Sequence, residues 1–459
     1  MHLSSLSSPH GIGTMGKDAR EFVDFLAASG QGYWQLLPIC PTGYGDSPYQ
    51  SYSTFAGNPY FIDLDELEKQ GFLKKEEYEN IDWESESESI NYGALYEKRY
   101  GVLEKAVERF LKIPTKQFYD FCEENTFWLE DYAAFMSEKD NRSGMGTSFW
   151  KALQYFFFLQ WKELKEYANE KGIRIIGDLP IYVSLDSVDV WAHPELFQLD
   201  EEGTPIEVAG CPPDGFSKDG QLWGNPLYDW KYMEGTNFAW WVRRIEYLCE
   251  VYDVLRIDHF RGFAGYYAIP YGEKTAKNGC WRKGPGMKLF SAVEQGIGKR
   301  NIIAEDLGHI TRDVRELLKD SGFPGMKVLQ FAFDSRDDGG TEYLPHNYDK
   351  HCVAYTGTHD NNTILGWFAE ADERDVSYAR EYLHMQEGDE PNWAMMDALW
   401  KSKAKLTIVT AQDLLGLGSE ARMNTPSTVG DNWKWRALPG VFTPELAEKI
   451  QKRMETYQR

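Results

Sequence analysis

The sequence predicts an α/β protein built as a (β/α)8 barrel with helical and loop insertions. Short apolar or β-branched runs alternate with longer segments of helical periodicity, a pattern typical of βαβ units and a parallel sheet. Nearly all of the strand candidates end in polar or charged residues. A barrel predicts this, because its active site lies at the C-terminal ends of the strands. We therefore expect residues 1–459 to form a single catalytic barrel.

The strands of this barrel can be assigned in chain order. The seven candidates are 33–39, 173–183, 253–260, 301–308, 326–333, 352–360 and 406–413. An eighth strand should precede the helix predicted at 15–28, but the chain begins almost there. A barrel of seven strands would leave two unpaired edges. We therefore expect the first strand to be truncated, with residues upstream of Met1 missing or with a stub at 1–6 in its place.

Two long insertions separate the strand candidates. Residues 62–168 are expected to be a largely helical insertion subdomain, because aromatic side chains recur there at helical spacing and core packing is the simplest use for them. Residues 184–235 are rich in Gly, Pro and Asp and are expected to be a loop-rich insertion. Loops of this length on the working face of a barrel commonly carry binding function.

Composition excludes several classes of protein. The 49 Lys and Arg residues are outnumbered by 72 Asp and Glu residues, and a net charge of -23 disfavours nucleic acid as a partner. The longest apolar run, 155–159, is far shorter than the roughly 20 residues of a membrane helix. The N-terminus lacks the features of a signal peptide, and the six cysteines form no C-x-x-C pair. We expect a cytoplasmic protein whose many aromatic residues offer flat surfaces for stacking on carbohydrate.

The first candidate catalytic residue is Asp258. Residues two apart on a strand share a face, so Arg256 and Asp258 should point the same way at the end of 253–260. A neighbouring guanidinium lowers the pKa of a carboxyl, which suits a nucleophile that must be anionic at neutral pH. The alternative interpretation is a structural Arg–Asp pair.

Glu305 is the second candidate, because it directly follows an apolar strand. Desolvation there would raise its pKa toward that of a general acid. One carboxyl with a lowered pKa and one with a raised pKa form the acid/base pair of retaining glycosidases.

His359 and Asp360 end the strand candidate 352–360. Asp360 is suited to bind sugar hydroxyls and to stabilise the charge of an oxocarbenium ion. Alternatively, the two residues cap the following helix. Glu305 lies 47 residues after Asp258, and Asp360 lies 55 residues after Glu305, which fits one and two β/α steps. All three carboxylates should therefore lie on one rim, on strands four, five and seven.

The sequence resembles the 4-α-glucanotransferases called amylomaltases or disproportionating enzymes, a branch of the α-amylase superfamily, over essentially the whole chain. The motifs that carry the resemblance are the three strand ends above and residues 43–50 (GYGDSPYQ), 55–60 (FAGNPY), 177–182 (GDLPIY) and 223–226 (WGNP). Relatives also carry a strand that ends before the stretch matching residues 3–6. Residues 210–216 (GCPPDGF) also match the family, in which the corresponding segment is a mobile loop over the cleft. The alternative interpretation of these residues is an ordinary proline-rich surface turn.

The resemblance implies a role for each candidate residue. It makes Asp258 the nucleophile, Glu305 the general acid/base and Asp360 the transition-state stabiliser. The residues it implies for substrate binding are Arg256, His259, His359, Tyr49, Asp178, Trp223 and Asp214. It implies transfer of α-1,4-glucan segments between maltooligosaccharides, with neither a cofactor nor a metal.

Three other functions remain open on sequence grounds. An amylase-type α-1,4-glucan hydrolase would use the same carboxylates, although the 46 residues after 413 leave no room for the C-terminal β-domain that amylases usually carry. A carbohydrate-binding or storage protein would not need intact Asp258, Glu305 and Asp360. A metal-dependent barrel enzyme would need more ligands than one His beside each Asp.

Overall fold

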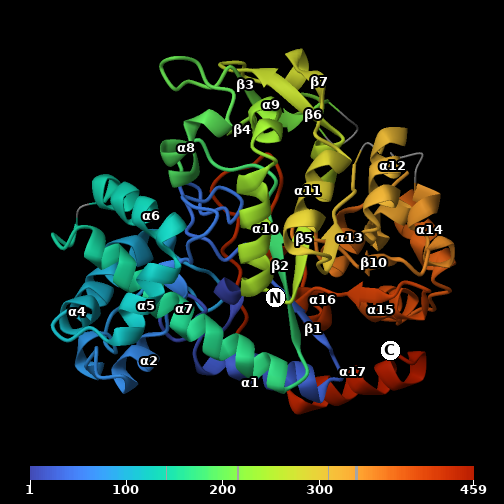
Figure 1. Cartoon of the computed structure of the whole chain (residues 1–459). Coiled ribbons are helices and arrows are strands. Elements are labelled where there is room, and N and C mark those ends of the chain that lie inside the picture. Colours follow the sequence, from blue (N-terminus) through green and yellow to red (C-terminus); the bar gives the residue numbers. More distant parts are fainter. Residues whose placement is uncertain (141, 214–216, 309, 336–339) are drawn as a thin grey trace. The chain divides into compact units, whose positions relative to one another are not determined.

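The computed structural model describes residues 1–140, 142–213, 217–308, 310–335 and 340–459 (Figure 1). The chain divides into two compact units, each assembled from separate stretches of sequence. Unit 1 comprises Met1–Ile175, Asp186–Pro194 and Lys434–Ala447, and unit 2 comprises Ile176–Leu185, Glu195–Trp433 and Glu448–Arg459.

Unit 1 is largely helical. Its helices are α1 Lys17–Ala28, α2 Leu64–Lys69, α3 Tyr92–Ala94, α4 Tyr100–Phe110, α5 Lys116–Glu124, α6 Thr126–Lys139, α7 Thr147–Glu170 and α8 Val188–Ala192, and its strand is β1 Tyr33–Gln35. Two elements, β2 Arg174–Leu179 and α17 Pro444–Tyr457, begin in unit 1 and end in unit 2. Residues Leu3–Ser5 form a 3-10 helix, so the alternative of a strand stub at 1–6 is wrong.

The core of unit 1 forms around α7, against which α4, α5 and α6 lie (Figure 1). Most aromatic side chains of these helices are buried, as the helical spacing predicts; Phe156, for example, packs against Phe110 with ring centroids 5.1 Å apart. Gln154 of α7 accepts a hydrogen bond from the Gly57 N–H at 2.7 Å and donates one to the Gly57 carbonyl at 2.9 Å. The loop that contains Gly57 is thereby held against α7.

Unit 2 contains the remaining elements. Its helices are α9 Trp230–Gly235, α10 Ala239–Val251, α11 Met287–Ile297, α12 Arg312–Ser321, α13 Ile364–Glu370, α14 Glu373–Tyr382, α15 Pro391–Lys401 and α16 Ala411–Leu415. Its strands are β3 Glu207–Cys211, β4 Gln221–Pro226, β5 Val254–Ile257, β6 Gly265–Pro270, β7 Cys280–Lys283, β8 Ile302–Ala304, β9 Gly325–Val328, β10 Cys352–Tyr355 and β11 Leu406–Ile408. Across the described residues of both units, no helix is both long enough and apolar enough to cross a membrane.

Parallel strands carry the centre of unit 2. Strand β5 pairs with β2 on one side and with β8 on the other, and β10 pairs with β9 and β11. Every strand candidate of the sequence overlaps one observed strand, and each strand is shorter than its candidate. The reason is that the polar ends leave the ladder: β5 stops at Ile257, directly before Asp258.

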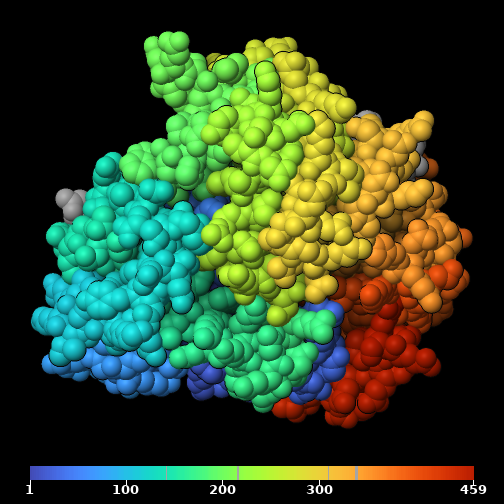
Figure 2. All heavy atoms as spheres, in the orientation of Figure 1, coloured from blue at the N-terminus to red at the C-terminus, as the bar shows by residue number. Residues whose placement is uncertain are grey.

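The parallel strands belong to two sheets, and a third sheet of unit 2 is antiparallel, in the order β4-β3-β6-β7. Strands β3 and β4 lie within 184–235, so the expectation that this segment is loop is wrong in part. Val208 and Ala209 of β3 are buried and stand opposite Ile269 and Ala268 of β6. This pairing stabilises the strand, although the Gly- and Pro-rich composition of the segment does not predict one. The turn between Leu199 and Pro205 protrudes from the surface of the unit (Figure 2).

Two glycines of unit 1 test the packing around α7. A Cβ on Gly57 would lie 2.1 Å from the Phe157 ring, and Phe157 is fully buried. We expect Gly57→Ala to lower the free energy of unfolding by about 1–3 kcal/mol, since overpacking a filled core forces side chains off their rotamers. Urea denaturation followed by circular dichroism measures the change.

The matched control is Gly101→Ala in α4, where an added Cβ meets no atom within 4 Å. This variant should gain about 0.5–1 kcal/mol, because Ala favours a helix interior over Gly. Equal effects of the two substitutions would contradict the packing described for Gly57.

Candidate active site

The site is built on three neighbouring parallel strands of unit 2. Because β2, β5 and β8 run in the same direction, their C-terminal ends meet at one edge of the sheet. Asp258 directly follows β5, and its N–H donates to the Leu179 carbonyl at 2.9 Å. Glu305 directly follows β8, and its N–H donates to the Ile257 carbonyl at 2.9 Å. These bonds continue the ladder past the strands and place the two carboxyl-bearing residues side by side.

Arg256 links two carboxylates of the site. Its Nη1 lies 2.7 Å from both oxygens of Asp178, which stands opposite it on β2, and donates to Asp258 Oδ1 at 3.1 Å. Arg256 and Asp178 are buried, with 4% and 3% of their surfaces exposed. The expected common face of Arg256 and Asp258 is confirmed by this contact.

Glu305 is held by two backbone donors. The His259 N–H donates to Oε2 at 2.6 Å, and the Leu307 N–H donates to Oε1 at 2.9 Å. Burial, with a further contribution from the charge of Asp258, raises the pKa of Glu305 to about 7. This direction agrees with the sequence expectation and leaves the carboxyl able to hold a proton near neutral pH.

Asp258 departs from the sequence expectation. Burial raises the pKa of Asp258 to about 7, and the carboxylates of Asp178 and Asp360 add to the rise. Arg256 acts in the opposite direction, but its charge is shared with Asp178, so the expected lowering of the pKa is wrong. Asp258 and Glu305 therefore titrate as a pair. Arg256 contacts Asp258 directly and favours its anionic form.

His259 lies beside the pair in a left-handed backbone conformation, with φ of 52°. Burial lowers the pKa of His259 to about 3, and the charge of Arg261 acts in the same direction, so the imidazole is neutral. Its ring meets the Trp223 indole edge to face, with centroids 4.8 Å apart. Trp223 belongs to β4, so the antiparallel sheet supplies an aromatic side chain to the site.

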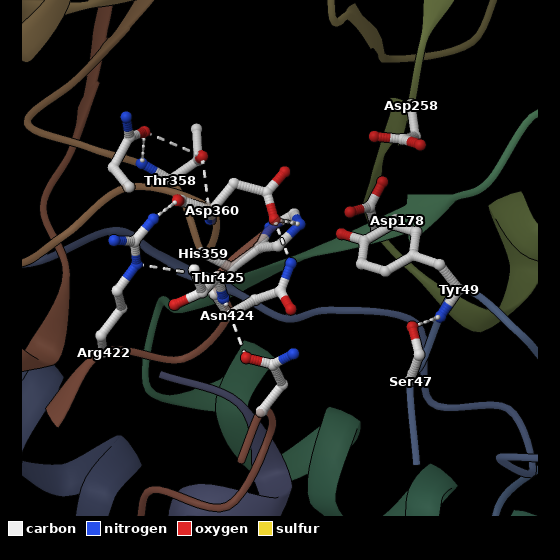
Figure 3. Close-up of polar contacts among 12 residues, drawn as sticks. Ser47, Tyr49, Asp178, Asp258, Thr358, His359, Asp360, Arg422, Asn424 and Thr425 are labelled. Carbon is white, nitrogen blue, oxygen red and sulfur yellow. Dashed lines mark hydrogen bonds and ion pairs between the residues drawn. The ribbon is translucent and has the colours of Figure 1, made fainter. Parts of the chain in front are cut away.

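Asp360 lies in the loop between β10 and α13, together with His359 (Figure 3). Its Oδ1 accepts a hydrogen bond from Asn424 Nδ2 at 2.6 Å and lies 3.3 Å from His359 Nε2. The carboxylate side chain is 48% exposed. Helix α13 is capped by Thr363, whose side chain accepts from the Gly366 N–H, so the alternative that Asp360 caps this helix is wrong.

Sequence reasoning missed two residues beside Asp360. Arg422 Nη2 donates to the Asp360 carbonyl at 2.6 Å and its Nε donates to the Asn424 carbonyl at 2.9 Å (Figure 3). Both residues follow α16 in a stretch without periodicity, so only their polarity marks them in the sequence.

Two of the expected site residues, Tyr49 and Asp214, are not among the site residues that unit 2 brings together. Tyr49 belongs to unit 1, where its N–H donates to Ser47 Oγ at 3.2 Å. Asp214 lies outside the described residues. Among the residues that are described, no three His, Cys, Asp or Glu side chains are grouped so as to hold a metal ion.

Comparison with known proteins decides the family. A family model described as 4-alpha-glucanotransferase matches residues 1–152 and 141–440. The chain belongs to this family. A 4-alpha-glucanotransferase of Clostridium butyricum is 49% identical over 487 residues, and the match covers 100% of both chains. A 4-alpha-glucanotransferase of Streptococcus pneumoniae is 45% identical over 488 residues, and the match covers 100% of this chain and 96% of that protein. The structure of an amylomaltase from Streptococcus agalactiae in complex with acarbose matches with a TM-score of 0.97 at 42% identity, covering 100% of this chain and 98% of that chain.

Membership of the 4-α-glucanotransferase family confirms the resemblance and the fold class inferred from the sequence. It also supports a transferase over the amylase-type hydrolase, because the similar proteins carry the transferase name over their full length.

The Arg256 contacts give a directional prediction for this glucanotransferase. Asp178→Asn removes a negative charge near Asp258 and leaves Arg256 to pair with Asp258 alone, so the pKa of Asp258 should fall. A ¹³C NMR titration of protein labelled at the Asp carboxyl carbons measures it, with the Asp258 signal assigned by its loss in Asp258→Asn. Asp320→Asn, on the exposed side of α12, serves as the control. A rise of the Asp258 pKa in Asp178→Asn would contradict the interpretation.

Proposed function

We propose that this chain transfers α-1,4-glucan segments between maltooligosaccharides by a retaining double displacement. The observation that carries the proposal is the pair of carboxyls at neighbouring strand ends, whose pKa values are both raised to about 7 and of which Asp258 is in direct contact with a cation. Such a pair provides one carboxylate and one carboxylic acid at neutral pH, which retaining glycosyl transfer requires.

In the first displacement, the Asp258 carboxylate attacks the anomeric carbon and the glycosidic C–O bond breaks. Glu305 gives its proton to the leaving oxygen, so the products are a glucosyl ester on Asp258 and a shortened glucan with a free 4-OH. In the second displacement, the 4-OH of an acceptor glucan attacks the same carbon while Glu305 takes its proton. Asp258 leaves as a carboxylate, and the configuration is retained after two inversions.

The other candidate residues hold the sugar. Asp360 stabilises the positive charge that develops at the cleaved position. Arg256, His259 and His359 contact that sugar, and His259 can donate a hydrogen bond as a neutral imidazole, since burial lowers its pKa to about 3. The residues proposed to line the donor and acceptor sites are Tyr49, Asp178, Trp223 and Asp214.

We propose that the segment 210–216, of which 214–216 lie outside the described residues, covers the reacting sugar. A cover that excludes water would favour attack by an acceptor sugar over hydrolysis of the ester. We further propose that the enzyme needs no cofactor, because the chemistry above uses only side chains of the chain itself. We also propose that it acts in the cytoplasm, as expected from the sequence.

Incubation with maltotriose tests the reaction. We expect the protein to release glucose and to form a ladder of longer maltooligosaccharides, and we expect Asp258→Asn to lower this activity by at least about 10³-fold, since the covalent step is lost. Chromatography of the products measures both. The exposed Asp320→Asn is the control and should retain the ladder. Shorter products alone would show a hydrolase instead.

The carboxyl pair also predicts the pH profile of kcat/KM for maltotriose. Activity should fall as the pH rises above about 7, because Glu305 then loses the proton it must donate. It should also fall below about 7, because Asp258 then becomes protonated. Initial rates at low substrate concentration from pH 5 to 9 measure the profile. A profile that is flat across neutrality would contradict the assigned pair.

A further inference from the structure

The loop 356–364, which carries His359 and Asp360, is held at its base by a buried carboxylate. Asp413 of α16 is 1% exposed and accepts from Thr356 Oγ1 at 2.9 Å and from the Ile364 N–H at 2.7 Å. Thr356 begins the loop and Ile364 is the first residue of α13, so Asp413 fixes both ends. Both donors are neutral, and burial raises the pKa of Asp413.

Further contacts reach the middle of the loop from the same stretch of chain. Asn362 Nδ2 donates to Ser419 Oγ at 2.9 Å. Arg422 spans two backbone carbonyls, those of Asp360 at 2.6 Å and of Asn424 at 2.9 Å. The Asn424 side chain then donates to the Asp360 carboxylate at 2.6 Å. Residues 411–424 therefore contact the loop at its start, its middle and its end.

We propose that residues 411–424 position the Asp360 carboxylate, and that Arg422 is the positioning residue on which its placement depends. The proposal rests on the role of Asp360 proposed above. Asp360 is half exposed, so packing alone does not fix its side chain. Its carboxylate is held through Asn424, and Arg422 holds the Asn424 backbone against the Asp360 backbone.

The geometry of Arg422 makes it difficult to replace. A guanidinium presents several donors in one rigid plane, and two of them reach two different carbonyls here. The ammonium of Lys is a single point donor on a flexible stem, so it cannot hold both carbonyls at this spacing. Loss of the bridge leaves the fold intact but lets Asp360 move away from the developing charge.

Arg422→Lys tests the proposal. We expect kcat with maltotriose to fall by roughly 10- to 100-fold, because a small displacement of a positioned group has effects of this size. KM should stay within about twofold and Tm within a few degrees, because the hydrogen bonds of Arg422 go to two backbone carbonyls of surface loops. Arg453→Lys is the matched control, since Arg453 of α17 pairs with Asp397 at 3.1 Å, away from the loop, and should keep full activity.

A second variant approaches the same loop from its base. Thr356→Val removes one donor to Asp413 with little change of volume, and kcat should again fall while KM stays unchanged. Unchanged kcat in Arg422→Lys, or a fall that is matched by a loss of Tm, would overturn the proposal. Asp360→Asn separates the role of Asp360 from the positioning role of Arg422. If Asp360→Asn keeps its activity, the proposed role of Asp360 fails. If Asp360→Asn loses activity while Arg422→Lys keeps its kcat, only the positioning role fails.

Discussion

The ion pair between Arg256 and Asp178 allows the other acidic groups of the site to lie close together. Asp258 and Glu305 end the neighbouring strands β5 and β8, and the charges of Asp178 and Asp360 also act on Asp258. These carboxylates would repel each other if nothing opposed them. Arg256 is buried and contacts Asp178 on one side and Asp258 on the other. A buried cation between two carboxylates offsets part of their desolvation, whereas removal of any one member would leave an uncompensated charge.

This arrangement also explains why burial decides the pKa values. One guanidinium is shared between two carboxylates, so Asp258 receives only part of its charge. Desolvation of Asp258 then exceeds the attraction, and its pKa rises to about 7. Burial likewise raises the pKa of Glu305 to about 7, and the negative charge of Asp258 adds to the rise. Burial is therefore the main cause of the raised pKa of both carboxyls, and the neighbouring negative charges add to it.

The sequence was a good guide to the parallel strands and a poor one to the elements around them. The apolar runs before Asp258, Glu305 and Asp360 marked β5, β8 and β10 because buried parallel strands are continuously hydrophobic. Strands β3 and β4 were missed because only their pairing with each other and with β6, distant in sequence, buries them. The same limit applies to chemistry: the pairing of Arg256 with Asp178 and the contacts of Arg422 both depend on residues that are remote along the chain.

The left-handed backbone of His259 has a mechanical consequence. In this conformation its N–H turns toward Glu305 Oε2, while the Phe260 N–H reaches the Glu305 carbonyl and the Glu305 N–H reaches the Ile257 carbonyl. Glu305, the proposed general acid, is therefore held by backbone groups to the strand end that carries Asp258, the proposed nucleophile. Thermal motion should carry these two carboxyls as one rigid body, while the third moves with its own loop. Of the three distances that define the site, the enzyme can adjust the two that involve Asp360 without changing the separation on which the stereochemistry depends.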